Sequence, residues 1–259
     1  MLTLPLLPLK IHLTSLFLFS AVAFSAPVSA AEPKPIRALL ITGGCCHDYG
    51  FQAKALTGAT EKLGPITWTI VNDGGSTKNA KIKLYEDPNW AKPYDVVVHN
   101  ECFADLADAD YTRKITKAHR GGTPAVVIHC AMHTYRTLAI DDWREFLGVT
   151  SRKHDHQAHY AVTPTAAAKN HPAMRGFPEK WVTPMDELYI IEKTWPKTTA
   201  LATAVSESDG KTYPSIWTND FAGTRIFGTT WGHGNVTWHD PVFLTMIARG
   251  VRWAAGRDN

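Results

Sequence analysis

Three stretches of the sequence gather histidine, cysteine and carboxylate side chains directly after apolar runs. They are residues 43–49 (GGCCHDY), 99–102 (HNEC) and 129–133 (HCAMH). These residue types are the usual metal ligands and proton-transfer groups of proteins, and a loop of arbitrary sequence rarely collects so many of them. A single histidine alone is more often structural. The clustering marks the following as candidate catalytic or ligand-binding residues: His47, Asp48, Glu101, His129 and His133.

The second half of the chain supplies further candidates. They are Asp186, Glu187 and Tyr189 in residues 186–189 (DELY), His154 and His156 in residues 152–159 (RKHDHQAH), and His233 in residues 231–234 (WGHG). In an extended segment His154 and His156 would lie on one face, whereas the plainer interpretation of this segment is a solvated loop. The glycines on both sides of His233 would let a substrate approach its ring.

Topology predicts that part of this set converges. His47 and His129 each follow an apolar strand, and neighbouring strands of a sheet are about 5 Å apart. A carboxylate buried alone would be costly, so Glu187 should face a cation or histidines. The alternative is that Glu187 pairs with an arginine and each histidine is hydrogen-bonded separately. We predict one pocket in which at least two of these four bind a divalent metal, zinc or similar, or act on the ligand: His47, His129, Glu187 and His233. Asp186 is the further catalytic candidate.

The elements that must position these residues alternate along the first half of the chain. Apolar runs at 36–41, 66–71, 94–98 and 124–128 predict buried strands, and residues 52–63 and 108–119 predict helices between them. This pattern is typical of a mostly parallel, doubly wound sheet of α/β class, whose ligand crevice lies beyond the carboxyl ends of the strands.

The second half is less regular and predicts added antiparallel strands. The expected strands are residues 160–163, 188–191, 200–205, 215–218 and 225–230, and the expected helices are 142–147 and 241–255. Asp240 should cap the last helix, with Pro241 in its first turn. No internal repeat or linker divides the chain after Pro35, so we expect a single domain over residues 31–259.

The first thirty residues have the pattern of a signal peptide. A basic flank with Lys10 precedes an apolar run over 13–24, and residues 28–30 (VSA) resemble a cleavage site. About twelve apolar residues are too few to span roughly 30 Å of hydrocarbon, which disfavours an uncleaved anchor. The sequence thus predicts a periplasmic or secreted protein without a membrane partner once the leader is removed. A formal net charge of +3 also argues against a nucleic-acid partner.

Four cysteines in an exported protein would ordinarily suggest disulfides. Their positions argue against a disulfide framework, because Cys45 and Cys46 are adjacent while Cys102 and Cys130 each follow a strand. A pair such as Cys46 with Cys130 stays open, since the sequence does not give the distance.

Several motifs in the same order resemble the ThuA-like (trehalose-utilisation) family. They are residues 42–44 (TGG), 47–48 (HD), His129 after a strand, 170–172 (NHP), 186–189 (DELY), 232–233 (GH) and 250–254 (GVRWA), over nearly all of the predicted mature chain. The resemblance implies a fold like that of class I glutamine amidotransferases and a sugar or sugar-derived ligand, since several members are linked to disaccharide catabolism through 3-keto sugars. It does not extend to glutaminase chemistry, because Ile128 and Met132 stand where the glycines of a nucleophile turn around Cys130 would be.

Three functions fit these observations. The first is an enzyme that cleaves or isomerises an oxidised disaccharide or glycoside, with a metal or an acid–base pair to remove a proton from carbon and stabilise the enolate. The second is a carbohydrate-binding protein without turnover, and the third is a cysteine- and histidine-rich metal or redox protein. The sequence leaves open the substrate, the reaction type, the metal, the state of the cysteines and the oligomeric state.

Overall fold

The computed structural model describes residues 1–2 and 34–258. The predicted signal peptide therefore lies almost entirely outside the described residues. Within them, no helix is both long enough and apolar enough to cross a membrane. The compact unit that carries the fold begins at Lys34.

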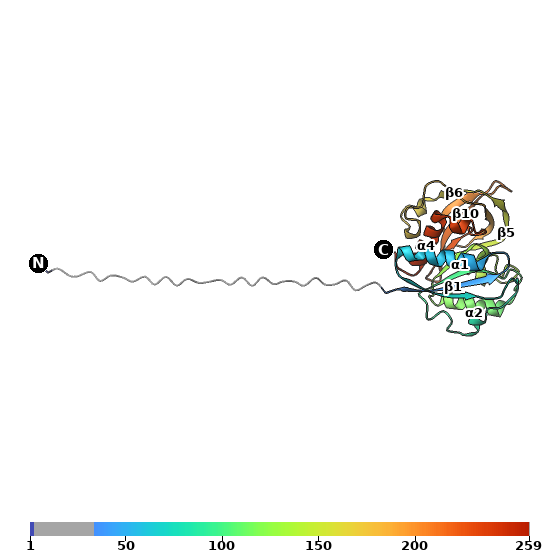
Figure 1. Cartoon of the computed structure of the whole chain (residues 1–259), viewed down its shortest axis with the longest axis horizontal. Coiled ribbons are helices and arrows are strands. Elements are labelled where there is room, and N and C mark those ends of the chain that lie inside the picture. The colour runs from blue at the N-terminus through green and yellow to red at the C-terminus, as the bar shows by residue number, and fades with distance from the viewer. Residues whose placement is uncertain (3–33, 259) are drawn as a thin grey trace. The chain divides into compact units, whose positions relative to one another are not determined.

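One large sheet forms the centre of this unit (Figure 1). Its first five strands are parallel and stand in the order β2 (Ile66–Asn72), β1 (Ile36–Gly44), β3 (Val96–Cys102), β4 (Ala125–Ile128) and β11 (Thr224–Thr229). The sheet continues antiparallel through β10 (Thr212–Phe221), β9 (Thr198–Val205), β6 (Ala161–Pro164) and β7 (Trp181–Val182). The expected fold class, a mostly parallel sheet with added antiparallel strands, is confirmed.

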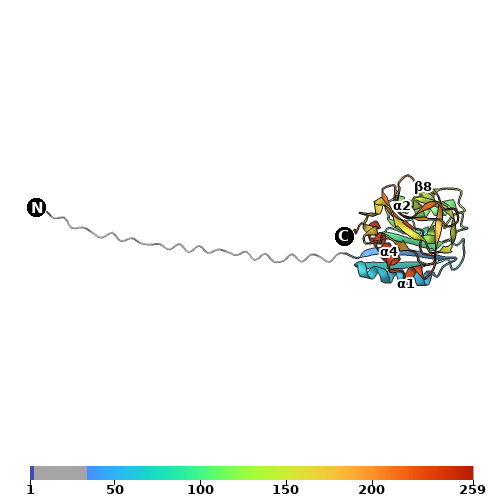
Figure 2. The same cartoon turned by 90° about the horizontal axis from the view of Figure 1, so that it is seen from above.

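Helices cover both faces of the parallel strands (Figure 2). On one side lie α1 (Tyr49–Thr60) and α4 (Pro241–Ala254), and on the other α2 (Ala109–Arg120) and α3 (Asp142–Leu147). Alternate residues of one strand enter opposite cores: Leu40 of β1 packs on the α1 side and Leu39 on the α2 side. All residues of β3 and β4 are buried, which is why these strands are apolar or tightly hydrogen-bonded throughout.

Short 3-10 turns complete the described elements. They are η1 (Glu61–Leu63), η2 (Lys83–Glu86), η3 (His129–Met132), η4 (Ala166–Ala168), η5 (Pro172–Met174) and η6 (Thr237–His239). Helix α4 begins as expected, because the Asp240 carboxylate accepts hydrogen bonds from the amides of Val242 and Phe243 at 2.8 and 2.9 Å. Helix α1 begins three residues before the expected start, since Asp48 caps it by accepting the amide of Phe51 at 3.1 Å.

A second sheet pairs β5 (Val149–Ala158) antiparallel with β8 (Asp186–Thr194). Residues 152–159 therefore lie mostly in a strand and not in a loop, although most of their side chains are exposed to solvent, as expected. The polar run concealed the strand because the side chains of β5 serve hydrogen bonds and ion pairs in place of an apolar core. The pairing sets His154 opposite Tyr189 and Gln157 opposite Glu187.

Strand β3 is longer than the apolar run that predicts it. It extends to Cys102, so residues 99–102 belong to the strand and are not a loop after it. The reason is that the parallel register with β1 continues, with Asn100 opposite Thr42 and Cys102 opposite Gly44.

Candidate functional site

Three histidines from distant parts of the chain meet at the carboxyl ends of the parallel strands. His47 lies in the loop after β1, His129 directly follows β4, and His233 lies in the loop after β11. One ring nitrogen of each lies within 4.8 Å of the corresponding nitrogens of the other two. The Nε2 atom of His47 is 3.3 Å from Nδ1 of His233. The structure therefore brings together the three histidines that the sequence analysis expects to converge.

Glu187 of β8 completes this group, which we call the histidine cluster: His47, His129, Glu187 and His233. The Oε2 atom of Glu187 is 3.2 Å from Nδ1 of His233 and 3.8 Å from Nε2 of His129. The same oxygen is 3.5 Å from Nδ1 of His154. Only 7% of Glu187 is exposed, and its partners are histidines, in contrast to the alternative in which it pairs with an arginine.

The backbone around the cluster is unusually constrained. His129 has φ of +47°, in the left-handed region that side chains rarely adopt. Gly232, with φ of +128°, packs against the same turn, and a Cβ atom there would lie 3.1 Å from Cγ2 of Ile128. A glycine is therefore required at position 232 to bring the β11 loop against the end of β4.

Hydrogen bonds fix which nitrogen of two rings faces the centre. Nδ1 of His129 lies 2.6 Å from the carbonyl oxygen of Thr230 and must donate to it, which leaves a lone pair on Nε2. Nδ1 of His47 lies 3.2 Å from the hydroxyl of Tyr49, whose own proton goes to the carbonyl oxygen of Cys45 at 3.0 Å. His47 thus donates through Nδ1 and also presents the lone pair of Nε2. This anchoring of the far nitrogen is typical of metal-binding histidines.

The members of the cluster differ in the direction of their pKa shifts. Burial lowers the pKa of His47 to about 4, helped by the charge of His233, and burial lowers the pKa of His129 well below its usual range. A hydrogen bond with Glu187 raises the pKa of His233. Burial works to raise the pKa of Glu187, but the hydrogen bond and charge of His233 outweigh it and leave the pKa lowered. Two neutral imidazoles therefore lie beside a carboxylate–histidine pair.

The donor set fits a divalent metal such as zinc. Neutral imidazoles and a carboxylate are common zinc ligands, at bond lengths near 2.0–2.2 Å. Tetrahedral geometry at such bond lengths places ligand atoms about 3.3 to 3.5 Å apart, which matches the 3.3 Å between His47 and His233. The chosen nitrogens of all three histidines lie within 4.8 Å of one another, so His129 lies in the same group of potential ligands.

Two aromatic neighbours and one amide border the cluster. The Tyr189 hydroxyl lies 3.4 Å from Nε2 of His129, and its ring stacks on His133 with centroids 4.0 Å apart. Burial lowers the pKa of His133 to about 3, so this ring is a neutral part of the wall. The Nε2 atom of Gln157 lies 2.8 Å from Nε2 of His233. Gln157 was missed from the sequence, and only recognition of β5 as the partner of β8 could have indicated it.

Asp186, which we expected to be catalytic, uses its carboxylate to hold neighbouring backbone groups. It is fully buried, and its carboxylate accepts hydrogen bonds from the amides of Glu187, Gly232 and His233 at 2.8 to 3.2 Å and from the hydroxyl of Thr237 at 2.7 Å. Burial raises its pKa to about 6 despite these bonds. With four donors around it, Asp186 holds the loop that carries His233 and acts as a positioning residue.

Three other expected ligand-binding residues bond to groups outside the histidine cluster. Asp48 is an exposed helix cap that also accepts a hydrogen bond from Asn235 at 3.2 Å. His156 pairs with Glu207 at 2.9 Å. Glu101 is fully buried; its Oε1 atom bonds to Nδ1 of His99 at 2.8 Å, and its Oε2 atom has no hydrogen-bond partner. These placements follow from helix capping, the irregular pairing of β5 and the extension of β3, which local sequence does not reveal.

The cysteines are paired, contrary to the expectation from their spacing. Cys45 is bonded to Cys46, and Cys102 to Cys130. The open alternative of Cys46 with Cys130 is therefore also wrong. The parallel strands explain the second pair, because the ends of β3 and β4 place the Cα atoms of Cys102 and Cys130 5.3 Å apart, within the usual range for a disulfide.

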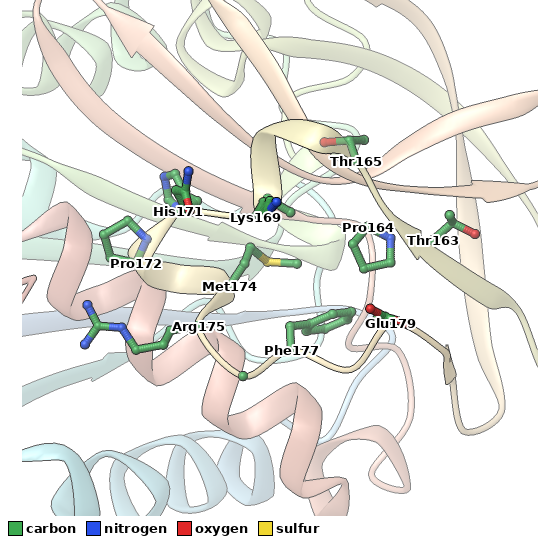
Figure 3. Close-up of a pocket in the computed structure, with 13 residues that line it drawn as sticks. Thr163, Pro164, Thr165, Lys169, His171, Pro172, Met174, Arg175, Phe177 and Glu179 are labelled. Carbon is green, nitrogen blue, oxygen red and sulfur yellow. The ribbon is translucent and has the colours of Figure 1, made fainter.

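A cavity of about 820 Å³ shares no residue with the histidine cluster. It is lined by residues between 163 and 179, and Figure 3 shows Met174 and Phe177 with the charged Lys169, Arg175 and Glu179 spread around them. Its charged groups do not converge on one point as the cluster does. The histidine cluster at the strand ends is therefore the stronger candidate for the functional site.

Comparison with known proteins identifies the family. Residues 41–254 match the family described as ThuA, trehalose utilisation. A ThuA-like protein from Parabacteroides merdae is similar in structure, with 22% identity, a TM-score of 0.68 and coverage of 86% of this chain and 90% of that one. A ThuA-like protein from Bacteroides uniformis has 16% identity, a TM-score of 0.65 and coverage of 89% and 95%.

A β-galactosidase from Bacillus circulans sp. alkalophilus shares the fold over 86% of this chain and 31% of its own length, with 10% identity and a TM-score of 0.56. No curated protein sequence matches. The resemblance predicted from the sequence motifs is confirmed by the family match and by the two ThuA-like structures. The chain belongs to the ThuA family.

Proposed function

We propose that the protein is an enzyme that cleaves or isomerises an oxidised sugar, such as a 3-keto disaccharide or glycoside, at the histidine cluster with a divalent metal. The observation that carries this proposal is the convergence of three imidazole nitrogens and one carboxylate, with two rings anchored so that their lone pairs face the centre. The family's description as trehalose utilisation supports a sugar-derived substrate.

The residues divide into two roles in this proposal. His47, His129 and His233 would hold the metal, which supplies a Lewis acid for a carbonyl or enolate oxygen when bound. Glu187, kept anionic by its histidine neighbours, would accept the proton from the carbon next to the ketone. Half-exposed His154, 3.5 Å from Glu187, would pass that proton to solvent.

The proposal includes the setting in which the enzyme acts. The signal-peptide pattern of residues 1–30 supports export to the periplasm or beyond, where a small-molecule sugar derivative is the expected partner. Mass spectrometry of the exported protein should find a chain that starts near Ala31. Retention of residues 1–30 would contradict export by cleavage.

A turnover screen with a matched pair of variants tests the activity. Purified protein is incubated with a panel of 3-keto disaccharides, with and without Zn²⁺, Mn²⁺ or Mg²⁺. We expect metal-dependent turnover of at least one substrate, and a loss of about 10² to 10⁴-fold in kcat in Glu187→Gln, the usual contribution of a general base. The control is Glu192→Gln, at an exposed end of β8 paired with Arg152, which should keep full activity.

The outcomes separate the competing functions. Sugar binding without turnover under every metal condition would favour a non-catalytic carbohydrate-binding protein. Full turnover in the presence of a strong chelator would contradict a metal-dependent reaction. An unchanged kcat in Glu187→Gln would contradict the role of Glu187 as the base.

A further inference from the structure

All four cysteines of the chain lie beside the histidine cluster, where they form two adjacent disulfides. Cys45 and Cys46 follow β1, Cys102 ends β3, and Cys130 lies in η3. The Sγ atom of Cys45 is 3.7 Å from the Sγ atom of Cys102. The two disulfides are thus in contact through these two sulfurs, in a group we call the sulfur cluster: Cys45, Cys46, Cys102 and Cys130.

The approach of these sulfurs depends on the local backbone. The amide of Cys45 donates to the carbonyl oxygen of Cys102 at 3.2 Å, which extends the pairing of β1 with β3. Gly44 has φ of +90°, and a Cβ atom there would lie 2.2 Å from that same carbonyl oxygen. Only glycine permits this approach, so the contact between the two disulfides is fixed by the strands themselves.

Access to the sulfur cluster is one-sided. Cys46 is exposed, whereas Cys45, Cys102 and Cys130 are 6%, 2% and 7% exposed. A reductant from solvent can therefore reach Cys46 but not the buried Cys102–Cys130 disulfide. The route from Cys46 to that disulfide leads through Cys45 and its 3.7 Å contact with Cys102.

We propose that the sulfur cluster is a thiol–disulfide relay through which an external dithiol reduces the buried Cys102–Cys130 disulfide. One thiolate of the dithiol attacks Sγ of Cys46, which breaks the Cys45–Cys46 bond and releases Cys45 as a thiolate. The second thiol of the reductant then attacks the mixed disulfide at Cys46. The reductant leaves as a disulfide, and Cys46 is released.

The electron pair then moves inward by a second exchange. The Cys45 thiolate attacks Sγ of Cys102, which breaks the Cys102–Cys130 bond and releases Cys130. Cys46 attacks Sγ of Cys45, which restores the Cys45–Cys46 disulfide and releases Cys102. In sum, two electrons and two protons pass from the dithiol to Cys102 and Cys130, and an external disulfide drives the reverse sequence.

The relay has an evident target, because each disulfide adjoins one metal-site histidine. Cys46 directly precedes His47, and Cys130 directly follows His129. Opening the Cys102–Cys130 bond removes the covalent link between β3 and the η3 turn, which begins at His129 with its φ of +47°. The redox state of the sulfur cluster would thereby control the alignment of the site.

A trapping experiment tests the central exchange. Cys46→Ser with Cys130→Ser leaves only Cys45 and Cys102, and mild oxidation should join them in nearly every molecule, as shown by non-reducing peptide mapping. The matched control is Cys45→Ser with Cys102→Ser, which leaves Cys46 and Cys130 and should form that pair about tenfold more slowly or not at all. Free thiols at Cys45 and Cys102, or equally fast pairing in the control, would overturn the relay.

A rate measurement tests the inward transfer independently of the first experiment. Cys45→Ser with Cys46→Ser keeps only the buried disulfide, whose reduction by dithiothreitol is followed by alkylation and mass spectrometry. The relay predicts reduction at least about tenfold slower than that of Cys102–Cys130 in the wild-type protein. An unchanged rate in a variant with unchanged circular dichroism would refute it. Both readouts are thiol maps, so they hold whether or not the proposed sugar chemistry is correct.

Discussion

At the scale of single residues, the site depends on which nitrogen of each histidine is left free. Thr230 and Tyr49 hold the outward nitrogens of His129 and His47, and the inward lone pairs follow from those two contacts. If these histidines bind a metal as proposed, its affinity would depend on groups that never touch the metal.

Tyr49→Phe tests this indirect control. The substitution removes the hydroxyl that accepts the Nδ1 proton of His47, while the ring that packs among the cysteines is kept. We expect the affinity for Zn²⁺ to fall about 10 to 100-fold by isothermal titration, the usual effect of losing such a partner. Tyr213→Phe is the control, because its hydroxyl donates to the carboxylate of the exposed Asp209, outside the histidine cluster. Equal affinities in the two variants would show that the Tyr49 contact does not orient His47.

At the scale of elements, the site is assembled by loops that other elements hold in place. The loop after β11 owes its position to Asp186 at the start of β8, whose carboxylate accepts from Gly232, His233 and Thr237. β8 thus supplies both Glu187 and the support for His233.

Asp186→Asn should misplace that loop. The amide group would direct N–H donors at backbone amides, leaving buried donors without acceptors, at a cost of about 1–3 kcal/mol in the free energy of unfolding. We expect a lower Tm and weaker metal binding together. Asp220→Asn, at an exposed position near the end of β10, should change the free energy of unfolding far less. A variant that loses activity with unchanged Tm and metal affinity would instead indicate a direct catalytic role for Asp186.

Some of these elements were predictable from the sequence and others were not. The parallel strands and their helices were predictable because each buried strand is a continuous apolar run, and helix α3 matches its prediction residue for residue. Strand β5 was not predictable, because its polar side chains resemble those of a loop. The contact of Gln157 with His233 and the pairing of His156 with Glu207 were therefore not predictable either. The convergence of His47 and His129 was predictable from strand ends, and the place of Glu187 beside histidines from the cost of burying a lone carboxylate. The four hydrogen bonds to the Asp186 carboxylate and the pairing of Cys102 with Cys130 depend on distances that only the fold sets.

At the scale of the whole molecule, buried histidines couple stability to pH. Besides the site, His119 on α2 is fully buried, contacts His99 at 3.0 Å and lies 2.7 Å from the carbonyl oxygen of Thr123, to which it donates. Burial lowers its pKa well below the usual range, helped by the charge of His99. The folded state therefore binds fewer protons than the unfolded state below about pH 6.5.

The sign of the pH effect follows from that difference. Because the folded-state pKa is depressed, stability is fully present above about pH 6.5 and falls as pH decreases, by at most about 1.4 kcal/mol per pH unit for one such histidine. We expect His119→Gln to be less stable at pH 7.5 but to lose less stability than the wild type between pH 7 and pH 5. Urea unfolding at several pH values measures both slopes. Identical slopes would mean that His119 does not contribute to acid sensitivity.

The proposed activity requires one metal site built from His47, His129 and His233. Equilibrium dialysis against Zn²⁺, read by elemental analysis, tests it most directly in untagged wild-type protein and in the triple variant His47→Ala, His129→Ala, His233→Ala, with His171→Ala as a control from outside the cluster. We predict one tightly bound ion per chain in the wild type and in His171→Ala, and none in the folded triple variant. A wild-type protein that binds no ion, or a triple variant that binds as much as the wild type, would contradict the account.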